Sequence, residues 1–312
     1  MTWSAADIPD QHGRIAVVTG ANGGLGLETG RQLAAKGAHV VMAVRNQDKA
    51  AAAVDEIRAS VPDAALELVA LDLASQASVR AAAEQILAAH QSIDLLINNA
   101  GVMGIPEAKT VDGFEMQLGV DHLGHWSLTA LLLPALLRTP GARIVTVTST
   151  AHLMGRAINP ANPHLHGRYR PWRAYGQAKL ANFHFGLGLQ RELESAGATT
   201  ASLIAHPGLS NTDLQAVSVQ ETGGGASQRL FFFLARHTGM SAANGALSQL
   251  RAATDPAAKG GEFYGPLFVN SGPPVRKPIV RRLGMDKAIA ALWEVSERET
   301  GIALDARAAA AA

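Results

Sequence analysis

Cysteine is absent from the 312 residues, which excludes a disulfide framework and any thiolate metal site. The absence fits a reducing compartment, and we expect the protein to be cytoplasmic. Charged residues are scarce at 17%, with a net charge of +1, so the sequence offers no electrostatic footprint for nucleic acid. The longest apolar runs, Leu128–Leu137 and Leu230–Ala235, are too short to span a bilayer. Met1–Asp10 lacks the features of a signal peptide. We therefore predict neither a membrane span nor a nucleic-acid partner.

The first half of the chain alternates short β-branched runs with alanine-rich stretches of helical length. One such stretch places Val79, Ala83, Ile86 and Leu87 on a single apolar helix face. Continuous apolar strands that alternate with helices indicate an α/β fold, with a doubly wound parallel sheet and helices on both faces. The expected strands are Ile15–Val18, Val40–Val44, Leu66–Leu71, Leu95–Ile97, Ile144–Thr148 and Ala201–Ala205.

No linker divides the chain, so we predict a single domain over residues 13–303. Residues 1–12 form an N-terminal extension. The tail 304–312 ends in a run of alanines, and we expect it to be disordered or artificially added. Residues 262–278 are rich in Gly and Pro, and Trp293 lies in a predicted final helix.

Two irregular segments are predicted to border the substrate. Residues 155–173 contain several prolines and glycines typical of turns, which predicts a loop. Residues 207–240 combine Gly223–Gly225 with Phe231–Phe233, which predicts a mobile lid that carries an apolar helix. The aromatic run would equally suit an oligomer contact or a helix on a membrane surface.

A glycine-rich turn follows the first predicted strand and opens a helix. Glycines at such a turn let the backbone approach a pyrophosphate, which the free N–H groups and dipole of the helix N-terminus favour. The spacing of Gly20, Gly24 and Gly26 differs from the ordinary GxGxxG, and a purely structural tight turn is the alternative. The candidate cofactor-binding residues of this turn are Gly20, Asn22, Gly23, Gly24, Leu25 and Gly26.

Polar side chains follow the next strands. An acid after the second strand would bond the adenosine ribose, but Arg45 stands there, and its fork of donors suits a 2′-phosphate. This favours NADP(H) over NAD(H), although a solvated arginine is common at a strand end. Asp72, followed by Leu73, is a candidate for binding adenine or for capping the next helix. The fourth strand is followed, at the edge where open α/β sheets bind ligands, by Asn99, Ala100 and Gly101.

Tyr175 and Lys179 are four residues apart and share one face of a predicted helix. A free tyrosine has a pKa near ~10, and a neighbouring cation stabilises the phenolate and lowers that pKa. Alone, such a pair is most often ordinary helix surface. Ser149 lies just past the strand Ile144–Thr148, where its hydroxyl can bond a substrate oxygen while Tyr175 transfers the proton. The alternative for Ser149 is a turn residue that ends the strand.

Together and in this order, the motifs resemble the short-chain dehydrogenase/reductase family over roughly residues 12–300. The resemblance rests on the glycine turn, Asp72, Asn98–Gly101, Ser149, Tyr175 with Lys179, and His206–Gly208 with Thr212. Retinol-dehydrogenase-like and protochlorophyllide-reductase-like members are most similar, through Gly113–Glu115, His122–His125 and Tyr175–Asn182. The resemblance implies a Rossmann-type fold, hydride transfer at a nicotinamide and proton transfer from Tyr175. It also implies that Lys179 binds the nicotinamide ribose and that Pro207, Gly208 and Thr212 belong to the segment that holds the carboxamide.

One position departs from the family. Asp121 stands where the family usually has an asparagine that holds a water of the proton relay. A carboxylate accepts hydrogen bonds but donates none. Our hypothesis is that Asp121 still supports the relay by accepting from Lys179 or its water. The nearby His122 and His125 have a spacing that a metal site could use, but helix packing is the simpler interpretation, and we predict no metal ligand.

These residues predict an NADP(H)-dependent oxidoreductase that interconverts a hydrophobic ketone or aldehyde and its alcohol. A cofactor-binding protein with little turnover and a reductase of an activated C=C bond are the alternatives. Whether copies associate as a homo-oligomer, through the helices that contain Asp121 and Tyr175, stays open; Leu128–Leu137 would supply such a face or belong to the core. The candidate substrate-pocket residues are His152, Met154, Trp172, Leu209 and Phe232.

Overall fold

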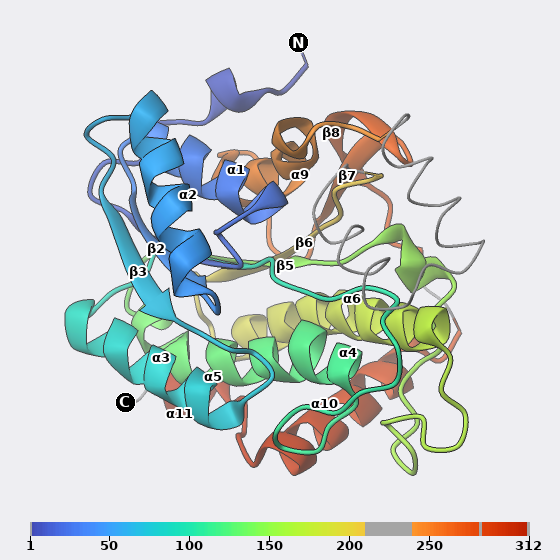
Figure 1. Ribbon diagram of the computed structural model, residues 1–312. Helices are drawn as coiled ribbons and strands as arrows, with labels where there is room; N and C mark the ends of the chain where they lie inside the picture. The colour runs from blue at the N-terminus through green and yellow to red at the C-terminus, as the bar shows by residue number, and fades with distance from the viewer. Residues whose placement is uncertain (1, 210–238, 281–282, 311–312) are drawn as a thin grey trace.

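An eight-stranded sheet forms the centre of the part of the chain that the structure describes, residues 2–209, 239–280 and 283–310 (Figure 1). In this computed structural model the strand order is β3-β2-β1-β4-β5-β6-β7-β8. Neighbouring strands are parallel except for the antiparallel pair β7 and β8. The strands are β1 (Ile15–Thr19), β2 (His39–Val44), β3 (Leu66–Ala70), β4 (Leu95–Asn98), β5 (Arg143–Val147), β6 (Ala201–Ala205), β7 (Phe263–Phe268) and β8 (Ser271–Lys277).

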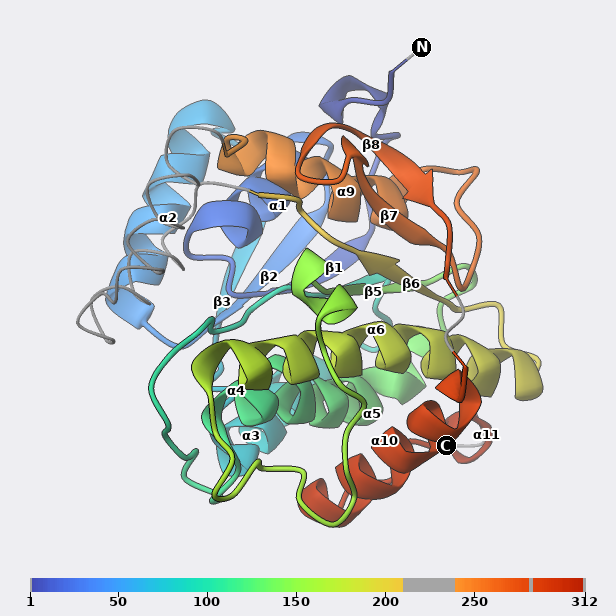
Figure 2. The ribbon, with the colours of Figure 1, turned by 90° about the vertical axis from the view of Figure 1, so that its right-hand side faces the viewer.

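Helices cover both faces of the sheet, which gives a three-layer α/β domain (Figure 2). One layer contains α1 (Gly24–Ala35), α2 (Gln47–Ser60) and α9 (Ala242–Thr254). The other contains α3 (Gln76–Ala89), α5 (Gly124–Leu137) and α6 (Pro171–Ser195), with α10 (Met285–Thr300) packed against α6. Shorter elements are η1 (Ala5–Asp7), α4 (Met116–Leu118), η2 (Gly119–Leu123), η3 (Thr150–Leu153) and α11 (Ala306–Ala310).

The apolar runs are continuous because both faces of each central strand are buried. In β2, Val40 and Met42 join the core under α1 and α2, whereas Val41 and Ala43 join the core under α3 and α5. Successive side chains of a strand point to opposite faces, so a strand covered on both sides must be apolar at every position. The six strands predicted from these runs are confirmed to within a residue at each end.

The strand order reverses at β1, which lies between β2 and β4. From β1 the chain continues to β2 and β3 on one side of the sheet, and then crosses to β4 and the later strands on the other side. A crevice opens at such a reversal, outside the carboxyl ends of the strands. The fold thus directs the residues that follow β1, β2, β3 and β4 toward a common edge.

The hairpin of β7 and β8 was not expected, since residues 262–278 are rich in Gly and Pro. Its prolines are tolerated because β8 is an edge strand, where a missing N–H costs no ladder bond. Pro266 and Pro274 stand opposite each other in the register. The pairing of β7 with β6 covers Phe263 and Tyr264 and does not include Pro266.

The prediction of a disordered tail is wrong for residues 304–310. Leu304 and Ala306 are only 3% and 1% exposed and belong to the main core. The short helix α11 contacts α5 and α6, and the Arg307 guanidinium donates to the Ser195 carbonyl oxygen at 3.0 Å. Alanines suit this position because a small side chain lets α11 approach its neighbours closely.

The apolar run Leu128–Leu137 is core. It forms most of α5, and Leu128, Leu132, Leu133 and Leu136 are buried against the sheet and neighbouring helices. Within the same chain, α11 packs on α5 and α10 packs on α6. No helix among the described residues is long and apolar enough to cross a membrane.

Candidate active site

The glycine turn joins β1 to α1 in a tight bend. Gly20 has a φ of +68°, which glycine adopts without strain, and Gly23 is the N-cap of α1 with no side chain to occupy the helix end. A Cβ on Gly26 would lie 2.2 Å from the Gly20 carbonyl oxygen. The N-terminus of α1 thus has no side-chain cap on its backbone N–H groups, as an anion-binding site requires.

The end of β1 is fixed to the end of β4 through Thr19. Its hydroxyl accepts from the backbone N–H groups of Asn99 and Ala100, both at 2.9 Å. The Asn99 side chain donates to the Thr19 carbonyl oxygen at 2.8 Å and accepts from Gln249 of α9 at 3.1 Å. Asn99 therefore braces the crevice and does not line it.

A cavity of about 240 Å³ occupies the carboxyl edge of the strands. It brings together seven of the predicted cofactor residues: Gly20, Asn22, Arg45, Asp72, Leu73, Ala100 and Gly101. The other predicted residues of the turn, Gly23, Leu25 and Gly26, form the helix start beside it. Asp72 does not cap α3, because Ser75 is the N-cap and accepts from the Ser78 N–H.

Several lining residues of this cavity were not predicted. Lys49 and Asn46 border it beside Arg45, and Val102 and Val120 border its other end. Arg45 and Lys49 are exposed, so two cations face the same space. The signal for Lys49 was available, because it follows Arg45 by four residues and lies in the first turn of the helix that follows β2.

Ser149, Tyr175 and Lys179 meet at the same edge, past the end of β5 and on α6. The Ser149 hydroxyl hydrogen-bonds the Tyr175 phenol and accepts from the Ala151 N–H at 3.2 Å. The Lys179 Nζ lies 5.5 Å from the centre of the Tyr175 ring. Tyr175 and Lys179 are buried, at 8% and 5% exposure. The Tyr175 phenol thus lies between the Ser149 hydroxyl and the Lys179 cation, and Gly101, which lines the cavity, lies next to that cation.

Asp121 pairs directly with Lys179. It lies in the π-helical turn η2 between α4 and α5 and is fully buried. One carboxylate oxygen, Oδ2, is 3.0 Å from the Lys179 Nζ, and Oδ1 accepts from the Val102 N–H at 2.7 Å. A Cβ on Gly101 would lie 3.1 Å from both Oδ1 and Nζ. Gly101 therefore borders the cavity on one side and the ion pair on the other.

Burial and the neighbouring charges have opposing effects on the pKa values of this group. Burial raises the pKa of Tyr175 above its ordinary value; the Lys179 cation and the Ser149 hydroxyl act to lower it, and Asp121 adds to the rise. Burial works against the charge of Lys179, but the neighbouring Asp121 carboxylate outweighs it and raises the lysine pKa. Burial raises the pKa of Asp121, with Lys179 acting in the opposite direction. Lys179 is thus held as a cation beside the phenol.

His122 and His125 support this site by packing. The His122 Nε2 pairs with the Ser296 hydroxyl at 2.8 Å, whereas the His125 Nε2 pairs with the Thr19 hydroxyl at 2.9 Å. The His125 Nδ1 donates to the Asp121 carbonyl oxygen at 3.0 Å. Burial lowers the pKa of His122 to about 3 and that of His125 to about 4, so both are neutral. Their nitrogens face different elements, which does not suit a shared metal ion.

The predicted pocket residues lie at different depths. His152 stacks on Phe183 with a centroid distance of 4.7 Å, and its Nδ1 donates to the Ser149 carbonyl oxygen at 2.6 Å. The Trp172 ring meets the Tyr175 ring edge-on at 6.0 Å. Met154 is 78% exposed, and together with Trp172 it lines a hollow beside the predicted 155–173 loop. That loop ends at Arg170, because α6 begins at Pro171 and includes Trp172.

The segment after β6 is described only at its two ends. Gly208 follows β6, and Leu209 is bonded through its backbone to Asn270 and Met240. Thr212, Phe232 and most of the predicted 207–240 lid lie outside the described residues. Pro207 to Leu209 do not line the 240 Å³ cavity.

Comparison with known proteins agrees with this geometry. A family model described as short chain dehydrogenase matches residues 14–223. Polyprenol dehydrogenase from Mus musculus is 46% identical over 213 residues, which cover 66% of this chain and 63% of that protein. Retinol dehydrogenase 12 from Homo sapiens is 44% identical over 202 residues, covering 65% and 63%. A solved structure of an uncharacterized protein from Mycobacterium paratuberculosis is 40% identical with a TM-score of 0.78, covering 97% of this chain and 99% of that one. The match spans less than two thirds of the length of these curated relatives.

Proposed function

The chain belongs to the short chain dehydrogenase family, and we propose that it interconverts a hydrophobic ketone or aldehyde and its alcohol with NADP(H). The observation that carries this proposal is the group of half-buried Ser149 with buried Tyr175 and Lys179, which adjoins the 240 Å³ cavity at Gly101. A phenol, a hydroxyl and a cation in contact are the groups that proton transfer to a carbonyl oxygen needs.

The residues of the cavity fit a nicotinamide dinucleotide. The bare N-terminus of α1 and the turn at Gly20 suit a pyrophosphate, and the missing side chain at Gly26 leaves that turn its tight shape. Asp72 and Leu73 border the space that would take the adenine. Arg45 and Lys49 offer two cations for a 2′-phosphate, which supports NADP(H) over NAD(H). When bound, the nicotinamide supplies or accepts the hydride.

The side chains divide the proton chemistry among themselves. In reduction, Tyr175 gives its phenolic proton to the substrate oxygen, and Ser149 holds that oxygen through its hydroxyl. Lys179 stabilises the phenolate that is left, because a nearby cation favours the charged form. Asp121 holds Lys179 in place through the 3.0 Å ion pair. In oxidation, the same phenolate accepts the proton of the alcohol.

The substrate class follows from the surroundings and from the relatives. Leu153 and Met154 follow Ser149 by four and five residues, and with exposures of 54% and 78% they present an apolar surface close in sequence to that hydroxyl. The two mammalian relatives are named as dehydrogenases of polyprenol and retinol. An apolar alcohol and its carbonyl form are therefore the proposed substrate pair.

The activity is tested by following NADPH absorbance with a panel of apolar ketones, aldehydes and enones. We expect turnover of ketones or aldehydes, and loss of that turnover in Tyr175→Phe. Tyr264→Phe is the matched control, because Tyr264 lies in β7, where its hydroxyl donates to Glu262, and neither residue lines the cavity. Turnover that survives Tyr175→Phe would refute the mechanism, whereas NADPH binding without any turnover would support a cofactor-binding role instead.

Cofactor preference has its own test. Arg45→Ala and Lys49→Ala should each raise the KM for NADPH about tenfold or more, a loss of ~1.4 kcal/mol, and leave the KM for NADH nearly unchanged. Arg58→Ala is the control, since Arg58 is an exposed cation in the last turn of the same helix. An unchanged ratio of the two KM values would refute the assignment of these cations to a 2′-phosphate.

A further inference from the structure

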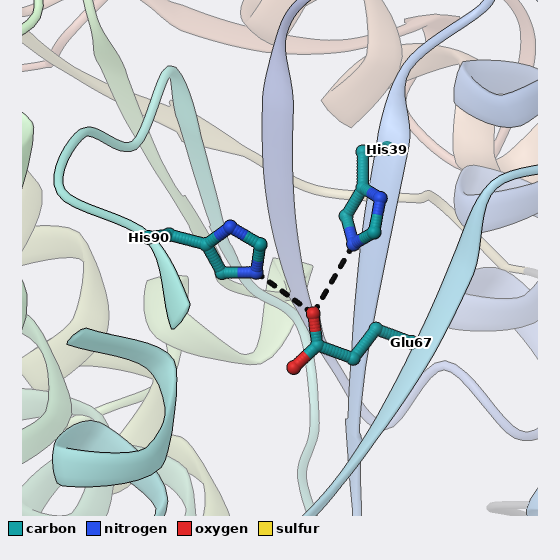
Figure 3. Close-up of side chains that lie close together, drawn as sticks. All are labelled: His39, Glu67 and His90. Atoms are coloured by element: carbon teal, nitrogen blue, oxygen red, sulfur yellow. Dashed lines mark hydrogen bonds and ion pairs between the residues drawn. The ribbon is translucent and has the colours of Figure 1, made fainter. Parts of the chain in front are cut away.

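Two imidazoles and a carboxylate converge at the opposite edge of the sheet from the cofactor cavity (Figure 3). The Glu67 Oε2 lies 3.1 Å from the His39 Nε2 and 2.7 Å from the His90 Nε2. One ligand atom from each of the three side chains lies within 4.8 Å of those of the other two. We propose that His39, Glu67 and His90 form a site for a divalent transition-metal ion, with Zn²⁺ as the expected occupant.

The fold brings these residues together from three separate elements. His39 begins β2 and Glu67 is the second residue of β3, and Glu67 stands opposite Val41 in the parallel register. His39 and Val41 share a face of β2, so His39 and Glu67 point to the same side of the sheet. That side is covered by α3, and His90 is the C-cap that ends α3 directly over the two strands. The cluster therefore sits on well-defined backbone.

The separations suit a metal site that needs little rearrangement. Ligand atoms of tetrahedral Zn²⁺ are separated by about 3.3 Å, given Zn–N and Zn–O bonds near 2.0–2.1 Å. The observed 2.7 and 3.1 Å contacts would open by about 0.6 and 0.2 Å to reach that separation, and the ligand nitrogens of the two imidazoles, which lie within 4.8 Å of each other, would settle at the same separation. The two rings lie 5.2 Å apart at an angle of 57°, so their nitrogens approach one point from different directions.

The donor set selects the metal. Two imidazoles and one carboxylate suit Zn²⁺ and its transition-metal neighbours, whereas Mg²⁺ and Ca²⁺ prefer all-oxygen sites. Each imidazole directs its Nε2 to the Glu67 Oε2, so the three donor atoms already face a common point. Three protein ligands leave a coordination position for water, and the partial exposure of His39, 37% of its side chain, gives access to it.

The place of the cluster indicates its role. It joins the edge strand β3 to β2 and to the end of α3. Arg45, at the cofactor edge, follows the far end of β2, roughly 20 Å away at about 3.3 Å per residue. A metal ion here would clamp the exposed edge of the sheet and leave the hydride and proton chemistry untouched.

The test uses the untagged full chain after chelator treatment, titrated with ZnCl₂ by calorimetry and by thermal denaturation. We expect one ion per chain and a rise in Tm of about 5 °C when the free Zn²⁺ concentration is about 100 times the Kd. MgCl₂ should produce no rise. His39→Gln, Glu67→Gln and His90→Gln should each weaken Zn²⁺ binding at least tenfold, whereas the exposed His166→Gln should bind as the unchanged protein does.

The Tm of each variant without metal separates lost binding from lost folding. Co²⁺ gives a second measurement, because its visible absorption reports a site of nitrogen and oxygen ligands and should vanish in Glu67→Gln. The proposal is overturned if Zn²⁺ leaves the Tm unchanged, or if the three variants bind Zn²⁺ as tightly as the unchanged protein. Turnover is not part of the readout, so failure here would leave the proposed activity standing.

Discussion

Replacing Asp121 by asparagine would leave Lys179 buried without its counter-ion. The carboxylate is fully buried, the lysine side chain is 7% exposed, and their charges are 3.0 Å apart. At an effective dielectric constant of about 20 that pair attracts by about 5 kcal/mol, much of which offsets the cost of burying both groups. Without the carboxylate, the cost of burying the Lys179 charge is no longer offset. We therefore expect Asp121→Asn to lower the free energy of unfolding by about 3 kcal/mol at pH 7. The asparagine oxygen can still accept from the Val102 N–H, so the backbone stays anchored.

The pH dependence gives this prediction its sign. In the unchanged protein Asp121 raises the pKa of Lys179, so the stabilisation is present at neutral pH and is lost only as the pH rises through that raised value. In the variant the two contributions of Asp121 are lost, and burial, the largest influence on Lys179, lowers the lysine pKa. The unfolded state then binds more protons than the folded state, and stability rises with pH. The difference between the two proteins should therefore shrink between pH 7 and pH 9.

Urea denaturation at the two pH values measures this difference, and NADPH turnover at pH 7 should fall more than about tenfold, a step of ~1.4 kcal/mol. Asp286→Asn is the matched control, because it removes an aspartate that pairs with Arg191 at 2.7 Å while 76% of its side chain is exposed. We expect the control to change stability by less than about 0.5 kcal/mol. A loss below about 1 kcal/mol in Asp121→Asn, or an equal loss at both pH values, would refute the reasoning.

Three further changes test other parts of the fold. Gly26→Ala places a Cβ 2.2 Å from the Gly20 carbonyl oxygen, so we expect a loss of about 1–3 kcal/mol in stability and weaker NADPH binding by fluorescence titration. Leu304→Ala should cost about 2–3 kcal/mol in urea denaturation, because Leu304 is 3% exposed in the main core. Burial raises the pKa of Glu115 to about 7. The folded state therefore binds the extra proton, and stability falls by about 2 kcal/mol from pH 5 to pH 7; Glu115→Gln should remove that part of the slope.

Each of these changes has its own control. Gly30→Ala lies in the same helix, where a Cβ would meet only ordinary contacts at 3.6 Å, and it should be neutral. Leu283→Ala removes a fully exposed leucine and should also be neutral. Equal effects of either variant and its control would contradict the packing argument. For Glu115, the free energy of unfolding is measured between pH 5 and pH 7. An equal decrease in Glu115→Gln would show that the Glu115 carboxyl does not titrate in this range.

The sheet was predictable where the local sequence and the environment agree. The six apolar runs were found because strands buried on both faces must be apolar at every position, and nothing in their flanks contradicts the pattern. The β7–β8 hairpin was missed because its prolines oppose strand structure locally, and only its place at the edge of the sheet allows them. The tail was missed for a similar reason: alanines carry no periodic signal, and their burial depends on α5 and α6, which are distant in the sequence.

The crevice residues were predictable because each follows a strand directly, and parallel strands end at the same edge. Asp121 shows where that logic stops. The sequence indicates that a carboxylate can accept from Lys179, but the direct ion pair depends on the π-helical turn η2, which has no clear sequence signature. Lys49 is a different case. Its spacing of four residues from Arg45 is visible in the sequence, but only the cavity shows that both cations face the same space.

The cluster of His39, Glu67 and His90 could be predicted neither from apolar runs nor from residues that directly follow a strand. Its members are separated by 28 and 23 residues, so no short motif links them. Each is also unremarkable alone: a histidine that begins a strand, a glutamate in an edge strand and a histidine that ends a helix. The carboxyl ends of the strands attract attention because glycines and catalytic side chains mark them, whereas the amino ends carry no such mark. A parallel register nevertheless brings side chains together at both ends of the strands. At the amino ends no sequence motif marks them, so a metal site there is found only from the three-dimensional structure.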